Sequence, residues 1–61
     1  MPIVTVKMIE GRTDEQKRAL VEEVTAAVSK TVNAPKESVT IIIEEMQKNH
    51  YATAGVRLSD K

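Results

Sequence analysis

The sequence lacks cysteine, tryptophan and phenylalanine, and Tyr51 is its only aromatic residue. A chain of 61 residues buries only about 60% of the surface that its unfolded form exposes. Such small domains usually need disulfides, a metal or self-association. The lack of cysteine excludes disulfides and thiolate metal sites, and the lone His50 does not build a metal site by itself. Self-association is the remaining source of buried surface, so we expect an obligate homo-oligomer.

The sequence also lacks an excess of charge of either sign. Nine basic and nine acidic side chains give a formal net charge of zero, whereas nucleic-acid binding needs a concentrated positive face. No apolar run is long enough to cross a membrane, and the first residues lack the pattern of a signal peptide. We expect a cytoplasmic protein without nucleic-acid or membrane partners.

Residues 3–9 are rich in β-branched side chains and predict a strand. Alternation places one set of side chains on one face and a second set on the other. Gly11 suits a tight turn after this strand. The first set is Val4, Val6 and Met8, and the second is Ile3, Thr5, Lys7 and Ile9.

Residues 13–32 predict an amphipathic helix of about five turns. Thr13 and Gln16 have the spacing of a capping box, which marks the start of a helix. Asn33 tolerates the left-handed conformation that closes a helix, and Pro35 prevents continuation. Apolar or small residues recur at helical spacing at Leu20, Val24, Ala27, Val28 and Thr31, while Lys17, Arg18, Glu22, Glu23 and Lys30 are assigned to the solvated side.

Residues 39–46 predict a second strand, which is apolar on both faces at its centre. One helix covers only one face, so we expect another subunit to cover the second. Residues 51–57, with Gly55, predict a short irregular hairpin, and the last three residues are expected to fray unless a neighbour holds them. The pattern predicts a single domain over residues 1–61 of the α/β (α+β) class. It is a βαβ protomer with two parallel strands, one long helix and a short C-terminal hairpin, whose sheet is completed by oligomerisation.

Pro2 is the first candidate for catalysis. Removal of Met1 converts its nitrogen from an amide into a secondary amine. An apolar environment lowers the pKa of an amine, and a base poised near the working pH transfers protons well. Arg12, at the predicted turn between strand and helix, is the second candidate, because its guanidinium can bind a carboxylate through two parallel hydrogen bonds. The structural alternative for Arg12 is a solvated loop residue.

Several segments together resemble the 4-oxalocrotonate tautomerase family over nearly the whole chain. They are the N-terminal Met-Pro-Ile, the run Glu10-Gly11-Arg12-Thr13-Asp14-Glu15-Gln16-Lys17, and the pairs Ala34-Pro35, Glu45-Met46 and His50-Tyr51.

The resemblance implies a hexamer built as a trimer of dimers and an enzyme that needs no metal or organic cofactor. Pro2 is then the general base that moves a proton between oxygen and carbon of an enol or dienol 2-oxo acid. Arg12 binds the substrate carboxylate, and Tyr51 matches a position where the family often has phenylalanine, as an apolar wall. The backbone of Ile9 from a neighbouring subunit matches a position that contacts substrate.

One residue departs from the resemblance. Thr40 stands where well-studied members have an arginine that polarises the 2-oxo group, and threonine is a weak substitute for a guanidinium. Because loss of a charge-stabilising donor typically costs about 10²–10³ in turnover, a monoacid enol such as phenylenolpyruvate is as good a candidate substrate as the dicarboxylate dienol. Arg57 is either a compensating guanidinium in a neighbour's pocket or one half of a surface salt bridge. His50 is interpreted as a surface or turn residue.

Two other functions remain open. The first is hydrolytic dehalogenation of haloacrylates, with protonated Pro2 as the acid; it ranks lower because the second arginine is missing. The second is a non-catalytic self-assembling module in which Pro2 only begins a strand. Retention of Met1 favours this module, since the Pro2 nitrogen is then a tertiary amide without basicity.

Overall fold

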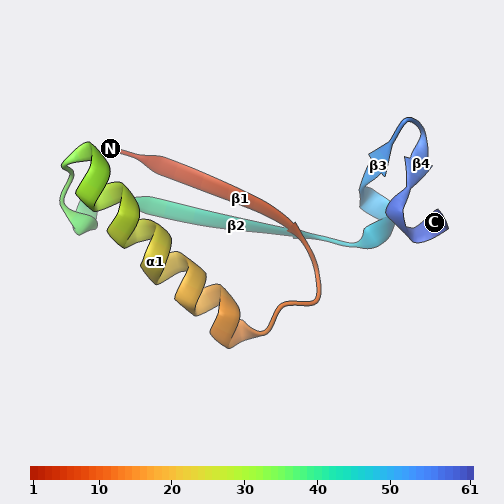
Figure 1. Cartoon of the computed structure of the whole chain (residues 1–61), viewed down its shortest axis with the longest axis horizontal. Coiled ribbons are helices and arrows are strands. Elements are labelled where there is room, and N and C mark those ends of the chain that lie inside the picture. Colours follow the sequence, from red (N-terminus) through yellow and green to blue (C-terminus); the bar gives the residue numbers. More distant parts are fainter.

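The computed structural model describes all 61 residues, arranged as a βαβ unit followed by a small C-terminal arm (Figure 1). The βαβ unit consists of β1 (Ile3–Ile9), α1 (Asp14–Val32), a short 3₁₀ turn η1 (Lys36–Ser38) and β2 (Thr40–Met46). The arm, residues 48–61, contains η2 (Lys48–His50), β3 (Ala52–Thr53), β4 (Val56–Arg57) and η3 (Leu58–Asp60). The predicted fold class is confirmed.

The strands β1 and β2 are parallel and pair over their whole length, from Ile3 opposite Thr40 to Ile9 opposite Met46. At the amino end the Thr40 amide donates to the Pro2 carbonyl at 3.0 Å, and at the carboxyl end the Glu10 amide donates to the Met46 carbonyl at 2.8 Å. The ladder therefore extends one residue beyond β1 at each end. The second strand begins at Thr40, one residue later than predicted.

The ends of α1 are formed by the predicted residues. The Thr13 hydroxyl accepts from the Gln16 amide at 3.1 Å, and the Gln16 side chain accepts from the Thr13 amide at 2.9 Å, which completes the capping box. At the other end Asn33 has φ 57° and ψ 49°, the left-handed conformation expected of a helix C-cap. Because Pro35 follows, the chain cannot continue as a helix.

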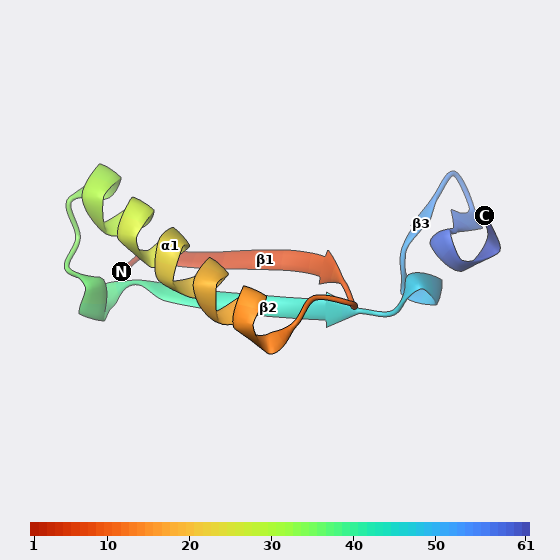
Figure 2. The same ribbon diagram turned by 60° about the horizontal axis from the view of Figure 1, so that its bottom comes forward.

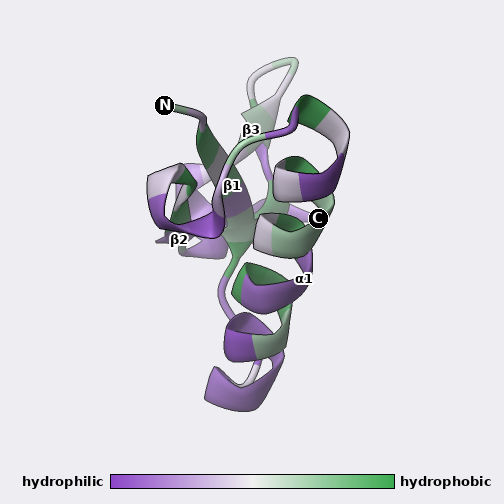
Figure 3. Ribbon diagram, turned by 90° about the vertical axis from the view of Figure 1, so that its left-hand side faces the viewer, coloured by the Kyte–Doolittle hydropathy of each residue, from purple (hydrophilic) through white to green (hydrophobic).

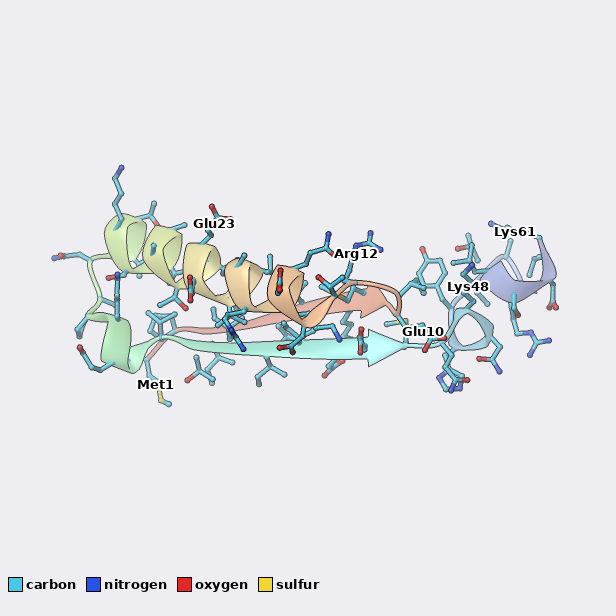
Figure 4. The ribbon with its side chains drawn as sticks, turned by 90° about the horizontal axis from the view of Figure 1, so that it is seen from below. Met1, Glu10, Arg12, Glu23, Lys48 and Lys61 are labelled. Atoms are coloured by element: carbon cyan, nitrogen blue, oxygen red, sulfur yellow. The ribbon has the colours of Figure 1, made fainter.

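The face of α1 that packs on the sheet is rotated slightly from the predicted one. Leu20, Val24 and Val28 are partly buried as expected, but Ala27 and Thr31 are exposed. Lys17, which the prediction placed on the solvated side, belongs to the covered face because it pairs with a strand carboxylate. The partly buried positions of the helix are Lys17, Leu20, Val21, Val24, Thr25, Val28 and Ser29. In contrast, Glu23 points away from the sheet (Figure 4).

Only one face of the sheet is covered within the protomer. Figure 2 shows α1 lying across the two strands on one side. Seen along the strands, the helix carries hydrophobic and hydrophilic residues on different sides, while much of the strand surface is hydrophobic (Figure 3). On the uncovered face Ile3 is 60% exposed and Ile42 is 44% exposed.

The protomer has no closed core of its own, since none of its 61 residues is buried. Its radius of gyration is 14.6 Å, whereas a compact domain of this length has about 10.5 Å. Its accessible surface is 4791 Å², compared with roughly 4,000 Å² for a compact monomer of this mass.

The C-terminal arm stands beyond the carboxyl end of the sheet, away from α1 (Figure 1). β3 and β4 pair antiparallel, and the turn between them uses positive φ angles at Ala54 (54°) and Gly55 (80°). The last residues were expected to fray. In the structure they form η3, and an ion pair between Arg57 and Asp60 at 2.9 Å closes that turn. No helix has the length and hydrophobicity that crossing a membrane requires.

Candidate active site

Arg12 lies at the carboxyl end of the sheet, in the loop that leads from β1 into α1 (Figure 4). The loop is fixed on both sides, by the Glu10 amide on the Met46 carbonyl and by the capping box of Thr13. Gly11, with φ 129°, provides a conformation that other residues adopt only with strain. Arg12 therefore projects from a short, well-anchored turn.

Arg12 opens onto a hollow of about 250 Å³. The hollow combines apolar surface with a few polar and charged side chains, a composition that suits a small-molecule site. Its lining residues are Met8, Arg12, Gln16, Lys17 and Leu20.

Arg12 is the only one of the three arginines that makes no ion pair within the protomer. Arg18 pairs with Asp14 at 3.5 Å, and Arg57 pairs with Asp60 at 2.9 Å. A planar guanidinium without a partner is suited to bind an external carboxylate through two hydrogen bonds. The geometry therefore keeps Arg12 available for an anionic ligand.

Lys17 and Glu45 form an ion pair of 2.7 Å next to this hollow, with side chains 28% and 35% exposed. The pair joins the first turns of α1 to the end of β2 and so braces the helix start that follows Arg12. Sequence reasoning missed it, although two signals were present. Lys17 lies three residues before Leu20, on the same side of the helix, and alternation along β2 points Glu45 toward α1 and Glu44 away from it.

A second hollow, of about 220 Å³, brings Ile9 and Tyr51 together. Tyr51 lies directly after η2, and its carbonyl accepts from the Leu58 amide at 2.8 Å, so the closure of the arm holds its backbone. Its side chain is 49% exposed in the protomer. The lining residues are Lys7, Met8, Ile9, Met46 and Tyr51. Met8 and Met46 thus form part of the wall of this hollow.

His50 lies in a third, more polar hollow at the same end of the sheet, of about 290 Å³. It is the last residue of η2 and is exposed, which confirms its interpretation as a turn residue. The other lining residues are Glu10, Glu45, Met46 and Gln47.

Pro2 and Thr40 lie together at the opposite end of the sheet, joined by the hydrogen bond between the Thr40 amide and the Pro2 carbonyl. Pro2 is partly covered, whereas Met1 projects freely and is 91% exposed. In the chain as translated, the nitrogen of Pro2 is bonded to Met1 as an amide and is not basic.

The five predicted site residues therefore form two groups in one protomer. Ile9, Arg12 and Tyr51 lie at the carboxyl end of β1, and Pro2 and Thr40 lie at its amino end. Seven residue steps of extended chain separate Pro2 from Ile9, which corresponds to about 23 Å. A single protomer does not bring the two groups into one site.

The fold and the position of these residues define the class of protein. A solved structure described as YwhB, a homologue of 4-oxalocrotonate tautomerase, superposes with a TM-score of 0.94 and 65% identity, and the match covers 98% of both chains. The family described as Tautomerase enzyme matches residues 2–61. The chain belongs to the tautomerase family.

Several bacterial proteins are similar to this chain over nearly their whole length. A probable tautomerase of Bacillus cereus is 69% identical over 61 residues, which is 100% of both chains. A protein of Bacillus subtilis named 2-hydroxymuconate tautomerase is 67% identical over 60 residues, covering 98% of this chain and 97% of the relative. A heterohexameric 4-oxalocrotonate tautomerase from Chloroflexus aurantiacus has a TM-score of 0.91 at 30% identity, and the match covers 98% of this chain and 97% of the other.

Proposed function

We propose that this chain is an isomerase that transfers a proton between oxygen and carbon in enol or 2-hydroxydienoate forms of 2-oxo acids. Its base is Pro2 after removal of Met1. The observation that carries the proposal is the placement of Pro2 before β1, behind an exposed Met1. A partly covered Pro2 directly precedes β1, its carbonyl accepts a hydrogen bond from the Thr40 amide, and Met1 is 91% exposed and so accessible for removal.

In this mechanism Pro2 removes the proton of the enol hydroxyl and returns a proton to carbon. Both steps use the lone pair of one secondary amine and need no metal or organic cofactor. Arg12 orients the substrate by binding a carboxylate, the role suited to the one arginine without an internal ion pair. The backbone of Ile9 and the ring of Tyr51 line the substrate beside Arg12.

The mechanism requires two protomers for each site, because Pro2 and Arg12 lie at opposite ends of a strand. We infer a homo-oligomer in which the amino end of one sheet meets the carboxyl end of a neighbour. The uncovered sheet face with Ile3 and Ile42 supports this inference, as does the absence of any buried residue. A hexamer built as a trimer of dimers is the assembly we propose, and a heterohexamer among the structural relatives supports it.

The name of the Bacillus subtilis relative favours 2-hydroxymuconate as a substrate to test first. Thr40, however, places no guanidinium beside Pro2. We therefore expect monoacid enols such as phenylenolpyruvate to be turned over at least as readily as the dicarboxylate.

The experiment compares Pro2→Ala with Pro35→Ala, the matched change at the only other proline of the chain. Pro35 lies beyond α1, before η1, and belongs to neither group of site residues. We expect Pro2→Ala to lower kcat/KM for ketonisation of 2-hydroxymuconate by about 10²–10⁴, the usual contribution of a general base. Pro35→Ala should retain the activity.

The mass of the purified protein should first show that Met1 has been removed. Full turnover by Pro2→Ala, or a protein from its native host that retains Met1, would contradict the proposal. Halide release from 3-chloroacrylate at a rate above ketonisation would instead support the hydrolytic alternative.

A further inference from the structure

Tyr51 carries a hydroxyl group for which the protomer provides no partner. None of the side-chain hydrogen bonds in the structure involves this hydroxyl. Tyr51 belongs to a mostly apolar hollow, whose other lining residues are Lys7, Met8, Ile9 and Met46. A phenol donor beside an apolar cavity satisfies its hydrogen-bonding capacity only with water or a ligand.

We propose that the Tyr51 hydroxyl donates a hydrogen bond to the substrate oxygen on C2, which gains negative charge during proton transfer. It thereby supplies part of the charge stabilisation that Thr40 cannot give. The inference rests on the proposed function and adds to it a specificity-determining donor.

The hollow of Tyr51 lies next to the hollow of Arg12. Met8 lines both the hollow that contains Arg12 and the hollow that contains Tyr51. In a dienol dicarboxylate, the carboxylate remote from C2 binds to Arg12, and the rest of the molecule extends past Met8 with its C2 end toward Tyr51. The two hollows are neighbours that share Met8, with Arg12 in one and Tyr51 in the other.

Lys7 is the only charged residue that lines the hollow of Tyr51. Its ammonium group lies 4.0 Å from a carboxylate oxygen of Glu44, and both side chains are more than half exposed. No carboxylate lines the hollow itself. An anionic oxygen is favoured in such surroundings, and a donor aimed at developing charge contributes most where apolar side chains exclude water.

The proton balance of the step is simple. Pro2 accepts the proton from the substrate hydroxyl, and the electron pair of the broken O–H bond remains on oxygen and delocalises into the enolate. Tyr51 keeps its own proton and donates a hydrogen bond to that oxygen. Pro2 then delivers a proton to carbon, the carbonyl forms, and no co-reactant is consumed.

The test is Tyr51→Phe, which removes one oxygen atom and keeps the ring. Thr53→Val is the matched control, because it removes a hydroxyl from β3 in the same arm, and that hydroxyl makes no hydrogen bond in the structure. We expect Tyr51→Phe to lower kcat and kcat/KM for 2-hydroxymuconate about tenfold, while KM changes less than about threefold, the signature of an interaction made in the transition state. Thr53→Val should leave both constants unchanged.

A kcat within twofold of the parent, or a loss confined to KM, would overturn the inference. The ring of Tyr51 would then act only as an apolar wall. Pro2→Ala remains inactive in either case, so failure of the inference is distinguishable from failure of the proposed function.

A second measurement does not depend on turnover. Because Tyr51 is the only tyrosine, fluorotyrosine incorporated into the protein gives a single fluorine NMR resonance. We expect this resonance to shift when the dicarboxylate keto product of 2-hydroxymuconate is added, and to remain unshifted in the Arg12→Ala variant at the same concentration. A resonance that does not respond in the parent protein would contradict a substrate contact at this hydroxyl.

Discussion

The two ends of the β1–β2 sheet differ in what they provide. At the carboxyl end, Arg12 and Tyr51 flank two neighbouring hollows, and a capping box together with the Lys17–Glu45 ion pair holds the surrounding backbone. At the amino end Pro2 directly precedes β1, its carbonyl accepts a single hydrogen bond, and no hollow surrounds it. In the proposed function, one end would bind the ligand without a base, and the other would supply the base without a pocket.

The difference shows how a chain too short for a core of its own can still form an active site. If a neighbour covers Pro2, the same contact excludes water from the amine and joins it to Arg12. The contact between protomers would then both complete the fold and assemble the catalytic site. Mixed oligomers, an interface variant and substitutions of the arginines test whether the two ends of the sheet belong to one site that two protomers share.

The largest expected effect is recovery of activity in mixed oligomers. Pro2→Ala and Arg12→Ala are each expected to have below about 1% of the parent activity toward 2-hydroxymuconate, by loss of the base and of carboxylate binding. Unfolding the two variants together and refolding them at equal amounts should restore about a quarter of the parent activity. If each site combines Pro2 of one protomer with Arg12 of another, about a quarter of the sites in the mixture contain both native residues.

The control mixture combines the parent chain with the double variant that carries both changes. A shared site again predicts about a quarter of the parent activity. A site within one protomer predicts about half for this control and no recovery for the first mixture. The two mixtures therefore separate the alternatives without knowledge of the assembly.

A smaller effect is expected at the uncovered sheet face. Ile42 lies near the middle of β2 and is 44% exposed in the protomer. Ile42→Lys would place an ammonium group in an apolar interface, where burial of an unpaired charge is strongly unfavourable. We expect dissociation, seen as a smaller species in analytical ultracentrifugation, and at least a tenfold loss of activity in dilute solution.

The matched control is Ala26→Lys, which makes the same kind of change on the exposed side of α1. It should leave the size and activity unchanged. An Ile42→Lys protein of parental size would show that this face is not the interface, and the sharing of sites would need another contact.

Local sequence signals predicted the elements of the fold. The capping box at Thr13, the left-handed Asn33 and the alternation in residues 3–9 each act over a few residues, so the chain itself reveals them. The contact of Lys17 with Glu45 was missed because it joins residues far apart in the sequence, and a lysine on a helix is by default assigned to solvent.

The candidate site was predictable only in part for a similar reason. Its residues could be named from motifs and from resemblance, but their separation into two groups follows from strand length and parallel pairing. The hollow shared by Ile9 and Tyr51 depends on the parallel pairing that places Ile9 opposite Met46, a contact between residues far apart in the sequence.

The smallest expected effect concerns Arg57, the other arginine considered as a compensating guanidinium. Its Nε and Nη2 atoms donate to the two oxygens of Asp60 at 2.9 and 3.2 Å, with both side chains 50% exposed. We expect Arg57→Gln to change kcat/KM less than twofold. Because exposed ion pairs contribute little, the free energy of unfolding should fall by only about 0.5 kcal/mol.

Arg12→Gln is the matched substitution, since it makes the same change at the arginine that lacks an internal partner. It should lower kcat/KM for the dicarboxylate by about 10², because the guanidinium that binds the substrate carboxylate is then missing. A tenfold loss in Arg57→Gln would show that Arg57 leaves Asp60 and enters a neighbour's site. The arm would then supply the second guanidinium, and Thr40 would no longer limit the choice of substrate.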